Sequence, residues 1–430
     1  MILVIGAGPA GLSAAYHLDS DCVVLEREAE VGGLCRSFEL GGTVFDYGGH
    51  AFFTKHDYAR DLALSLSPAG MYVQPRQAWV YSHGAFVPYP FQSNLYGLPQ
   101  EVIDDCLGGL PAAGATDGTD PRNLLEWLSA SFGDGIAKHF LRPYNEKLWA
   151  YPLADIAPNG SDRILTPDVE AIVAGARGRV PFTEFPNVTV AYPAAGGFAN
   201  VWGGFERHVG DRVERATVES IDFRRRTVTT EAGERLAYDR LVSTMPLTEL
   251  VARATGAPAG CRDAAGKLRH NSLHLVNIVV GRPIGTERRQ RVYAADPSIP
   301  FHKLVLNSNS SDDLRGRPVF GIQAEVSWSA HKPVAVETLQ ERVLATLLGM
   351  GIVETDDPIV ETSLVTVDYA YPVYTRDTAD ARSYLLDELA QFGVACAGRF
   401  GEWLYINSDD AVMRGKAAAE RIEAELAQPV

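Results

Sequence analysis

A run of hydrophobic residues opens the chain and passes directly into a glycine-rich turn. Residues 2–5 are all apolar, residues 6–11 read Gly-Ala-Gly-Pro-Ala-Gly, and apolar side chains then recur at helical spacing at Leu12, Ala15 and Leu18. A buried strand, a glycine turn and an apolar helix in this order form the unit that binds a dinucleotide pyrophosphate. The pattern therefore predicts an α/β fold with a nucleotide site near the N-terminus.

Three glycines of this turn have the spacing that pyrophosphate binding requires. Gly6 would make the tight turn, Gly8 would let the backbone approach the phosphates, and Gly11 would let the helix lie close to the strand. A second apolar run, residues 22–25, ends in Glu26, twenty residues after Gly6. A carboxylate at this position can accept hydrogen bonds from ribose hydroxyls, so we predict that Glu26 contacts the cofactor.

A second glycine pair distinguishes between the two common dinucleotides. Gly32 and Gly33 follow soon after Glu26. This continuation resembles flavoproteins of the glutathione-reductase and amine-oxidase type, where paired glycines let the loop pass close to FAD. We therefore predict FAD rather than NAD as the cofactor.

The C-terminal segment carries another cofactor pattern. A predicted strand at residues 393–397 leads into Gly398 and Arg399, and Ser408 precedes a predicted helix over residues 409–426. A C-terminal strand that returns to the N-terminal unit is how FAD domains of one piece close. The Ser408 hydroxyl could cap the last helix, whose positive end would then face the flavin ring.

The middle of the chain alternates between short strands and one long helical region. Strands are predicted within residues 71–90, 212–246, 271–281 and 317–328. Helices are predicted over most of residues 95–150, with a restart at Pro121 as the first helical position, and near residues 334–350.

Length, charge and cysteine content limit the possible function classes. The 430 residues exceed what a single core usually holds, so two or three lobes are expected. A net charge of −15 argues against a nucleic-acid or anionic-membrane surface. Five scattered cysteines without a C-x-x-C pair suit a reducing cytosol and predict neither disulfides nor a zinc site. No apolar run reaches the roughly 18–20 residues of a membrane span, so we expect a cytoplasmic protein.

Two motifs outside the cofactor segments predict a pocket for a flat heterocycle. Residues 89–92 read Tyr-Pro-Phe-Gln, and Asn145 and Trp149 lie four apart on one face of a predicted helix. Aromatic rings can stack on a base, and amides can read its donors and acceptors. Taken alone, each motif could also be structural. His270 and His274 are also four apart, but they adjoin a strand-like run where that spacing need not converge, so we predict no metal site.

With these motifs the sequence resembles the UDP-galactopyranose mutases, especially the branch with a Gly-Gly-His turn. The matching blocks are long and unusual, and they include residues 48–50, 79–92, 142–152, 163, 187–202, 371–372 and 398–415. The resemblance implies a discontinuous FAD-binding, Rossmann-like domain of the glutathione-reductase/amine-oxidase type. This FAD-binding domain is expected to comprise residues 1–70, 190–260 and 385–430. A helical nucleotide-sugar-binding insertion is expected at residues 95–185, and an antiparallel-sheet substrate domain at residues 71–94 and 261–384.

The resemblance also implies roles for individual residues. The uracil end of a UDP-sugar would be held by Tyr89, Gln92, Asn145 and Trp149. The diphosphate would be surrounded by Arg163, Asn187, Tyr293, Lys303, Tyr371 and Tyr405. FAD would be contacted by Gly6, Gly8, Gly11, Glu26, Gly33, Arg36, Gly49, Gly197, Gly398, Arg399 and Ser408. His50 would lie beside the flavin near its reactive N5, and His50, Arg163 and Lys303 would act in catalysis.

Three features bear on these implied roles. Pro372 follows Tyr371 and would interrupt strand pairing, which argues against core packing for that tyrosine. Lys303 stands where the family typically carries a second phosphate-clamping arginine, so bidentate clamping would be lost. Leu404 stands where a basic residue is common. We therefore expect the phosphate affinity, the nucleotide accepted or the sugar bound to differ from those of the family. The fold and the flavin site should be the same.

The implied reaction interconverts the pyranose and furanose forms of a nucleotide sugar, most simply UDP-galactose, without net redox change. FAD would first be reduced, by NAD(P)H or another reductant, and its N5 would bond to the anomeric carbon as the nucleophile. This would explain why the sequence carries no nucleophile elbow and no clear pair of glycosidase carboxylates.

Two other interpretations stay open. An FAD oxidase or desaturase of the amine-oxidase or protoporphyrinogen-oxidase group shares this domain plan but passes electrons to an acceptor. A non-catalytic nucleotide-sugar sensor would bind the ligand and convert nothing. The motifs at residues 89–92 and 142–149 favour the mutase.

Overall fold

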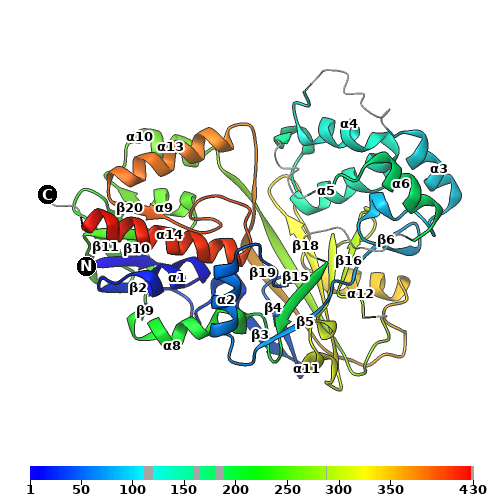
Figure 1. Ribbon diagram of the computed structural model, residues 1–430, viewed down its shortest axis with the longest axis horizontal. Coiled ribbons are helices and arrows are strands. Elements are labelled where there is room, and N and C mark those ends of the chain that lie inside the picture. The colour runs from blue at the N-terminus through cyan, green and yellow to red at the C-terminus, as the bar shows by residue number, and fades with distance from the viewer. Residues whose placement is uncertain (111–119, 159–163, 180–187, 287, 428–430) are drawn as a thin grey trace.

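The computed structural model describes residues 1–110, 120–158, 164–179, 188–286 and 288–427. Two lobes are joined by long strands (Figure 1). One lobe is built from the N-terminal segment, a middle segment over residues 206–265 and the C-terminal segment, and the other combines a group of helices with a seven-stranded sheet. The strands β15 (Arg269–Val280) and β19 (Ile359–Val373) extend between the lobes.

A five-stranded parallel sheet organises the first lobe, with the order β20-β13-β1-β2-β9. Its strands are β1 (Ile2–Ile5), β2 (Cys22–Glu26), β9 (Val213–Arg215), β13 (Arg240–Ser243) and β20 (Val394–Cys396). Side chains of β1 alternate between two cores: Ile2 and Val4 join one hydrophobic cluster, and Leu3 and Ile5 join the other. Burial on both faces explains why this strand is uniformly apolar.

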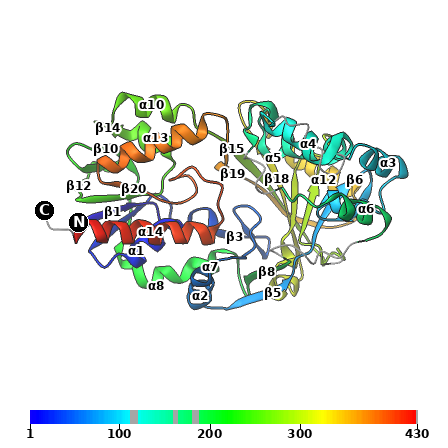
Figure 2. The same ribbon diagram turned by 45° about the horizontal axis from the view of Figure 1, so that its top comes forward.

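Two helices from opposite ends of the chain cover the face occupied by Ile2 and Val4. They are α1 (Pro9–His17) and α14 (Ser408–Leu426), which lie together in Figure 2. They pack closely because Gly415 has no side chain: a Cβ there would collide with the Ala10 carbonyl oxygen. The predicted α/β class with a Rossmann-like parallel sheet is confirmed.

The other face of the parallel sheet is covered by three helices and a small second sheet. The helices are α9 (Leu247–Arg253), α10 (Ala259–Ala265) and α13 (Thr378–Gln391). The small sheet contains β10 (Val218–Asp222), β11 (Thr227–Thr230), β12 (Arg235–Ala237) and β14 (Ala254–Thr255), in the order β12-β11-β10-β14.

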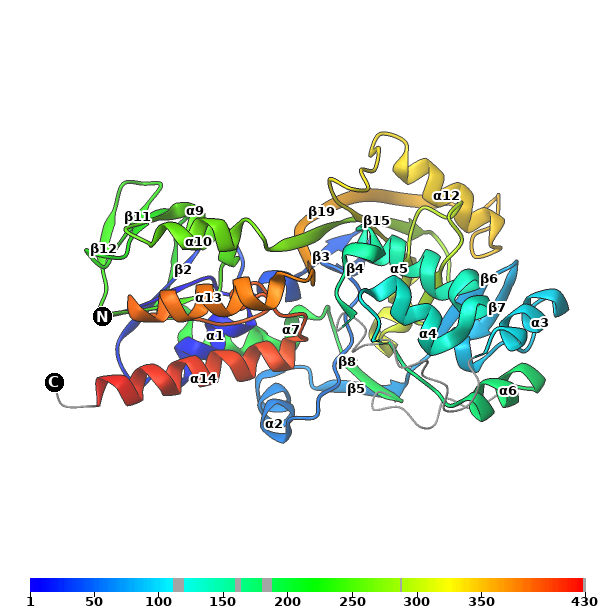
Figure 3. The same cartoon turned by 90° about the horizontal axis from the view of Figure 1, so that it is seen from above.

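The second lobe contains a seven-stranded sheet with the order β19-β15-β18-β17-β16-β6-β7. Besides β15 and β19, its strands are β6 (Ala78–Ser82), β7 (Ala85–Pro88), β16 (Arg291–Ala294), β17 (Lys303–Leu306) and β18 (Phe320–Trp328). All neighbours are antiparallel except β16 and β6, which pair in parallel, so the predicted antiparallel sheet is mixed at this point. Helix α12 (Leu339–Gly349) packs on one face of the sheet (Figure 3).

Strand β19 contradicts the expectation that Pro372 interrupts strand pairing. Tyr371 lies opposite Asn271, and Pro372 lies opposite His270, so the strand continues through the proline. The reason is that β19 is at the edge of the sheet, where one side of the strand needs no backbone donor.

The helical region predicted over residues 95–150 is present as several helices. They are α3 (Gln100–Gly108), α4 (Leu124–Ile136), the π-helical turn η3 (Ala137–Leu141) and α5 (Arg142–Trp149), followed later by α6 (Val169–Arg177). The prediction that Pro121 is the first helical residue was wrong. The Asn123 side chain caps α4 by accepting a hydrogen bond from the Glu126 N–H at 2.9 Å, and this cap fixes the start of the helix.

Short elements complete the connections. The strand pairs are β3 (Ser37–Leu40) with β4 (Thr43–Asp46), and β5 (Met71–Pro75) with β8 (Thr189–Pro193). The remaining helices of four residues or more are α2 (Asp57–Leu66), α7 (Ala199–Trp202), α8 (Glu206–Val209) and α11 (Asp312–Arg315). Among the described residues, no helix combines the length and the apolar character that a membrane crossing needs.

Candidate active site

A cavity of 1180 Å³ extends from the glycine turn after β1 to the seven-stranded sheet. One end is lined by Gly6, Gly8 and Glu26, and the other by Tyr293 and Lys303. This volume exceeds the roughly 300–1,000 Å³ that is typical of a pocket for one small ligand. The cavity therefore has room for a dinucleotide and for a second ligand beside it.

The glycine turn forms one wall of the cavity, and its backbone is tightly packed. Gly6 has a φ of +96°, and a Cβ there would collide with the Thr244 hydroxyl. A Cβ at Gly11 would collide with the Gly6 carbonyl oxygen, so Gly11 supports the turn from behind and does not line the cavity. At Gly8 the nearest atom to a Cβ would be Gly33 Cα, at 3.8 Å, so this glycine leaves space on the cavity side.

The Glu26 carboxylate is held at the end of β2 beside this turn. Its two oxygens accept hydrogen bonds from the Ala7 N–H at 2.6 Å and the Glu28 N–H at 2.9 Å. Because each carboxylate oxygen has two lone pairs, capacity remains for the two hydroxyls of a ribose. The glycine cradle and this carboxylate together fit the adenosine and pyrophosphate portions of FAD.

Arg36 and Gly33 form the neighbouring part of the lining. Gly33 has a φ of +54°, and a Cβ there would lie 3.1 Å from Gly8 Cα, so the two glycine segments touch. The Arg36 guanidinium donates to the Gly33 carbonyl oxygen at 3.0 Å and to Glu28 Oε2 at 3.1 Å. Arg36 therefore holds this turn in place as well as lining the cavity.

The C-terminal cofactor segment also lines the cavity, through Gly398, Arg399 and Ser408. The Arg399 guanidinium donates to the Ile406 carbonyl oxygen at 2.7 and 2.9 Å and to the Ala370 carbonyl oxygen at 3.1 Å, which ties the loop to β19. The prediction that the Ser408 hydroxyl caps the last helix was wrong. Ser408 is the first residue of α14 and Asn407 occupies the cap position without a side-chain cap bond.

His50 lies in the Gly-Gly-His turn at the centre of the cavity lining. Its ring stacks on Phe198 with centroids 4.7 Å apart. Burial, and then the positive charges of Arg399, Lys303 and Arg291, lower the pKa of His50 to about 3. The imidazole is therefore neutral near pH 7.

A buried carboxylate, Glu325 of β18, organises the region next to His50. Its Oε1 accepts a hydrogen bond from the Gly49 N–H at 2.7 Å, and its Oε2 lies 2.8 Å from Lys303 Nζ. The Gly49 position excludes any side chain, because a Cβ would collide with Val305. Arg291 donates to the His50 carbonyl oxygen, so the turn is held from two sides.

Arg76 and a group of tyrosines form the far end of the cavity. The Arg76 guanidinium lies over the Tyr89 ring at 5.0 Å and donates to the Tyr293 hydroxyl at 3.3 Å. Although burial alone would raise the pKa of Tyr293, the nearby cations Arg76, Lys303 and Arg291 lower it. Tyr371 and Tyr405 pack edge to face at 5.1 Å in the same lining. This end offers positive charge and hydroxyl donors, which suit an anion.

Three of the predicted uracil-binding residues lie behind the wall of the cavity instead of on its surface. Gln92 Nε2 donates to the Leu165 carbonyl oxygen at 2.6 Å, Asn145 Nδ2 donates to the Leu141 carbonyl oxygen at 2.7 Å, and Trp149 Nε1 donates to Asn145 Oδ1 at 3.1 Å. Their polar groups are engaged within the protein, and all three side chains are buried. Tyr89 is the member of this group that lines the cavity.

The remaining predicted site residues are Arg163, Asn187 and Gly197. Arg163 and Asn187 lie outside the described residues. Gly197 does not line the cavity, and a Cβ there would collide with Ser37, so its small size is explained by packing. Phe198, the next residue, provides the cavity surface at this point.

Glu325, Arg291 and Arg76 were missed by the sequence analysis. Glu325 stands between Ala324 and Val326 in the predicted strand over residues 317–328, and a charge between apolar neighbours was the available signal. Arg291 and Arg76 stand in short segments without a motif, and only the parallel pairing of β16 with β6 brings those segments together.

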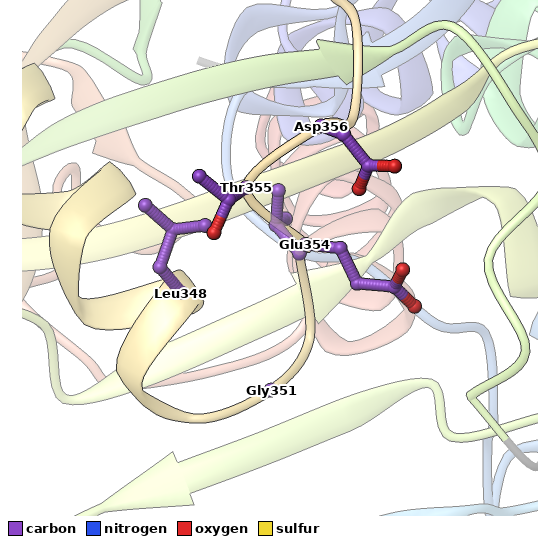
Figure 4. Close-up of a pocket in the computed structure, with 6 residues that line it drawn as sticks. Leu348, Gly351, Glu354, Thr355 and Asp356 are labelled. Carbon is purple, nitrogen blue, oxygen red and sulfur yellow. The ribbon is translucent and has the colours of Figure 1, made fainter.

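A second hollow, of 510 Å³, lies on the surface where α12 ends (Figure 4). Its lining includes Leu348, Glu354 and Asp356. None of the predicted site residues that the structure describes contributes to it, so the larger cavity is the candidate active site.

Comparison with known proteins agrees with this assignment. Residues 4–65 match the family of NAD(P)-binding Rossmann-like domains. The crystal structure of a reduced UDP-galactopyranose mutase superposes with a TM-score of 0.93 at 29% identity, covering 99% of this chain and 94% of that one. This chain has the UDP-galactopyranose mutase fold. The resemblance that the sequence predicted is thereby confirmed, and the fold is that of a flavoenzyme.

More distant relatives share the fold but carry other names. A putative protoporphyrinogen oxidase from Exiguobacterium sp. 255-15 has a TM-score of 0.74 at 18% identity, covering 99% of this chain and 98% of that one. Coproporphyrinogen III oxidase from Mycobacterium tuberculosis is 24% identical over 343 residues, which is 73% of this chain and 74% of that protein. The fold alone therefore accommodates both mutases and oxidases.

Proposed function

We propose that this protein is a flavin-dependent mutase that interconverts the pyranose and furanose forms of a nucleotide sugar, most simply UDP-galactose. The observation that carries this proposal is the agreement with reduced UDP-galactopyranose mutase over 99% of the chain. The cavity supports it, because it combines a dinucleotide cradle with an anion-binding end.

FAD would bind along the glycine cradle, with Glu26 at the ribose and the segment from Gly398 to Ser408 at the flavin end. When bound in its reduced form, FAD supplies a nucleophilic nitrogen, N5, for the anomeric carbon. The FAD-binding unit would comprise residues 1–70, 190–260 and 385–430, which contain all five strands of the parallel sheet and α14.

His50 would act beside the flavin as a neutral imidazole. Its low pKa means that it can offer one N–H donor and one acceptor nitrogen near pH 7, but not a positive charge. Phe198 and Arg291 would fix its ring and its carbonyl group, so that the imidazole has one orientation when substrate arrives. Positioning of this kind lowers the barrier by holding reacting groups in place.

The diphosphate would bind among Arg76, Lys303, Tyr293, Tyr371 and Tyr405. The Lys303 charge is already balanced by Glu325, so Arg76 would contribute the larger share of the attraction from this part of the lining. Tyrosine hydroxyls can donate to phosphate oxygens with little loss of side-chain freedom. Arg163 and Asn187 keep their predicted diphosphate roles as proposals.

Gln92, Asn145 and Trp149 would shape the base-binding end without touching the base. Gln92 holds Leu165, which lines the cavity, and Trp149 packs against Tyr405 with ring centroids 5.9 Å apart. In this arrangement the direct contact to uracil would come from Tyr89.

The decisive experiment supplies FAD-loaded protein, reduced with dithionite or NADPH, with UDP-galactopyranose and a small panel of other nucleotide sugars. Chromatography would separate the isomers, and the oxidised protein is the matched control. We expect isomerisation with the reduced protein only. If no panel member is isomerised, the mutase assignment is wrong.

An oxidase or desaturase is the second candidate, because the relatives include coproporphyrinogen III oxidase over 73% of the chain. Such an enzyme would consume an acceptor in proportion to product. Peroxide or reduced acceptor formed in stoichiometric amounts, with no isomerisation, would favour this candidate over the mutase.

A further inference from the structure

Three side chains from segments distant in sequence meet outside the cavity, where α2 begins beside the first turn of α14. They are His56, which precedes α2, and Asp409 and Asp410, which belong to α14. One nitrogen of the histidine and one oxygen of each carboxylate lie within 4.8 Å of one another. His56 Nε2 is 2.9 Å from Asp410 Oδ1.

One carboxylate oxygen of Asp409 has no hydrogen-bond partner among the described residues. The side chain is only 4% exposed, and this oxygen, Oδ1, is buried. A carboxylate in such surroundings is costly unless a cation or a proton accompanies it. The positive end of α14 offsets part of this charge, but a second carboxylate, Asp410, stands next to it.

We propose that His56, Asp409 and Asp410 bind a divalent metal cation of the zinc class. One imidazole nitrogen and two carboxylate oxygens are a ligand set that zinc accepts, with water in the fourth position. Ligand atoms around tetrahedral zinc are roughly 3–4 Å apart, which is compatible with the spacing of this cluster. Calcium and magnesium prefer sites made only of oxygen ligands.

The location gives the cation a defined effect. Ser408 and Ala411 in the first turn of α14 line the cofactor cavity, whereas the three proposed ligands do not. A bound cation would join α2 to this turn and fix the start of the helix that faces the flavin. The sequence analysis predicted no metal site from its cysteines and from His270 and His274, and it could not bring His56 together with aspartates more than 350 residues away.

Isothermal titration of the untagged, FAD-loaded protein with ZnCl2 tests this proposal. We expect one equivalent to bind, and at least tenfold weaker binding in His56→Gln and in Asp409→Asn. Asp57→Asn is the matched control, because this neighbouring carboxylate is exposed and paired with Arg60, and its binding should equal that of the wild type.

Thermal denaturation gives a second readout if one variant is poorly folded. Zn2+ should raise the Tm of the wild type and of Asp57→Asn, but not that of His56→Gln or Asp410→Asn. Absence of Zn2+ binding, equal binding by Asp409→Asn and wild type, or equally tight binding of Mg2+ would each overturn the proposal.

Discussion

Lys303 and Glu325 lie directly opposite each other on the antiparallel strands β17 and β18, with Lys303 Nζ 2.8 Å from Glu325 Oε2. Glu325 is fully buried, and its carboxylate is paired with this lysine at one oxygen and accepts the Gly49 N–H at the other, with the charge of Arg291 also nearby. The pair has two consequences. It reduces the positive charge that Lys303 can offer to a phosphate, and it fastens the Gly-Gly-His turn to the seven-stranded sheet.

Removing one member of this pair should destabilise the protein more than removing both. We expect Lys303→Met to lower the free energy of unfolding by about 3 kcal/mol, because it leaves a buried carboxylate without its direct ion-pair partner. The double variant Lys303→Met/Glu325→Gln should recover most of this loss. Urea unfolding measures both values. A double variant as unstable as the single one would show that the pair is not the source of the effect.

Two glycines of the cofactor turn should respond differently to alanine. Gly8→Ala should fold with a nearly unchanged Tm, because a Cβ would have room in the protein, but it should bind FAD more weakly. Gly11→Ala should lose stability, because the Cβ would collide with the Gly6 carbonyl oxygen. Thermal melting of the apoprotein and flavin absorbance after reconstitution separate the two outcomes. Wild-type flavin affinity in Gly8→Ala would place the pyrophosphate elsewhere.

Arg76→Ala should weaken UDP binding while leaving FAD bound. A charge-assisted hydrogen bond contributes about 1.5–3 kcal/mol, so the Kd for UDP should rise about 10- to 100-fold. Arg163→Ala should likewise weaken UDP binding far more than FAD binding. Arg60→Ala, which changes an exposed arginine on α2, is the control. Equal losses of UDP and FAD binding would indicate a folding defect rather than a binding role.

His50→Ala should retain flavin but turn over nucleotide sugar more slowly. The imidazole contacts Phe198 and lines the cavity, and FAD would be held by the glycine cradle and Glu26 as well. Steady-state kinetics of the reduced enzyme, with bound flavin quantified in parallel, gives the comparison. Unchanged turnover would remove His50 from the mechanism.

The low pKa of His50 also predicts a specific pH dependence of stability. Burial and the nearby cations lower this pKa from 6.5 to about 3 in the folded protein. Between those two values the unfolded chain binds a proton that the folded protein does not, so stability falls as the pH falls. In His50→Gln the slope between pH 6 and 4 should be smaller by up to about 1.4 kcal/mol per pH unit. Identical slopes would mean that His50 titrates normally.

The parts of the fold that could be predicted are those in which the pattern is local. The strand, glycine turn and helix at the N-terminus depend on neighbouring residues, and the structure has all three. Helix ends were less predictable, since Asn123 and not Pro121 fixes the start of α4, and Asn407 and not Ser408 occupies the cap position of α14. At each end, several polar or proline residues compete within a few positions.

The parts of the site that could not be predicted depend on pairing between distant strands. The Lys303–Glu325 pair requires the register of β17 with β18, and the position of Arg291 beside His50 requires the packing of β16. Likewise, the four-residue spacing of Asn145 and Trp149 placed them correctly on one helical face. The spacing could not reveal that these two side chains form a hydrogen bond with each other behind the wall of the cavity.

The packing of α14 on α1 and the position of β20 beside β13 have a consequence for biosynthesis. The lining of the flavin cavity begins at Ile5 and is completed only at Ala411. A nascent chain therefore lacks a wall of this cavity until Ala411 has been translated. Capture of a dinucleotide in this cavity would consequently have to follow synthesis of the chain through Ala411.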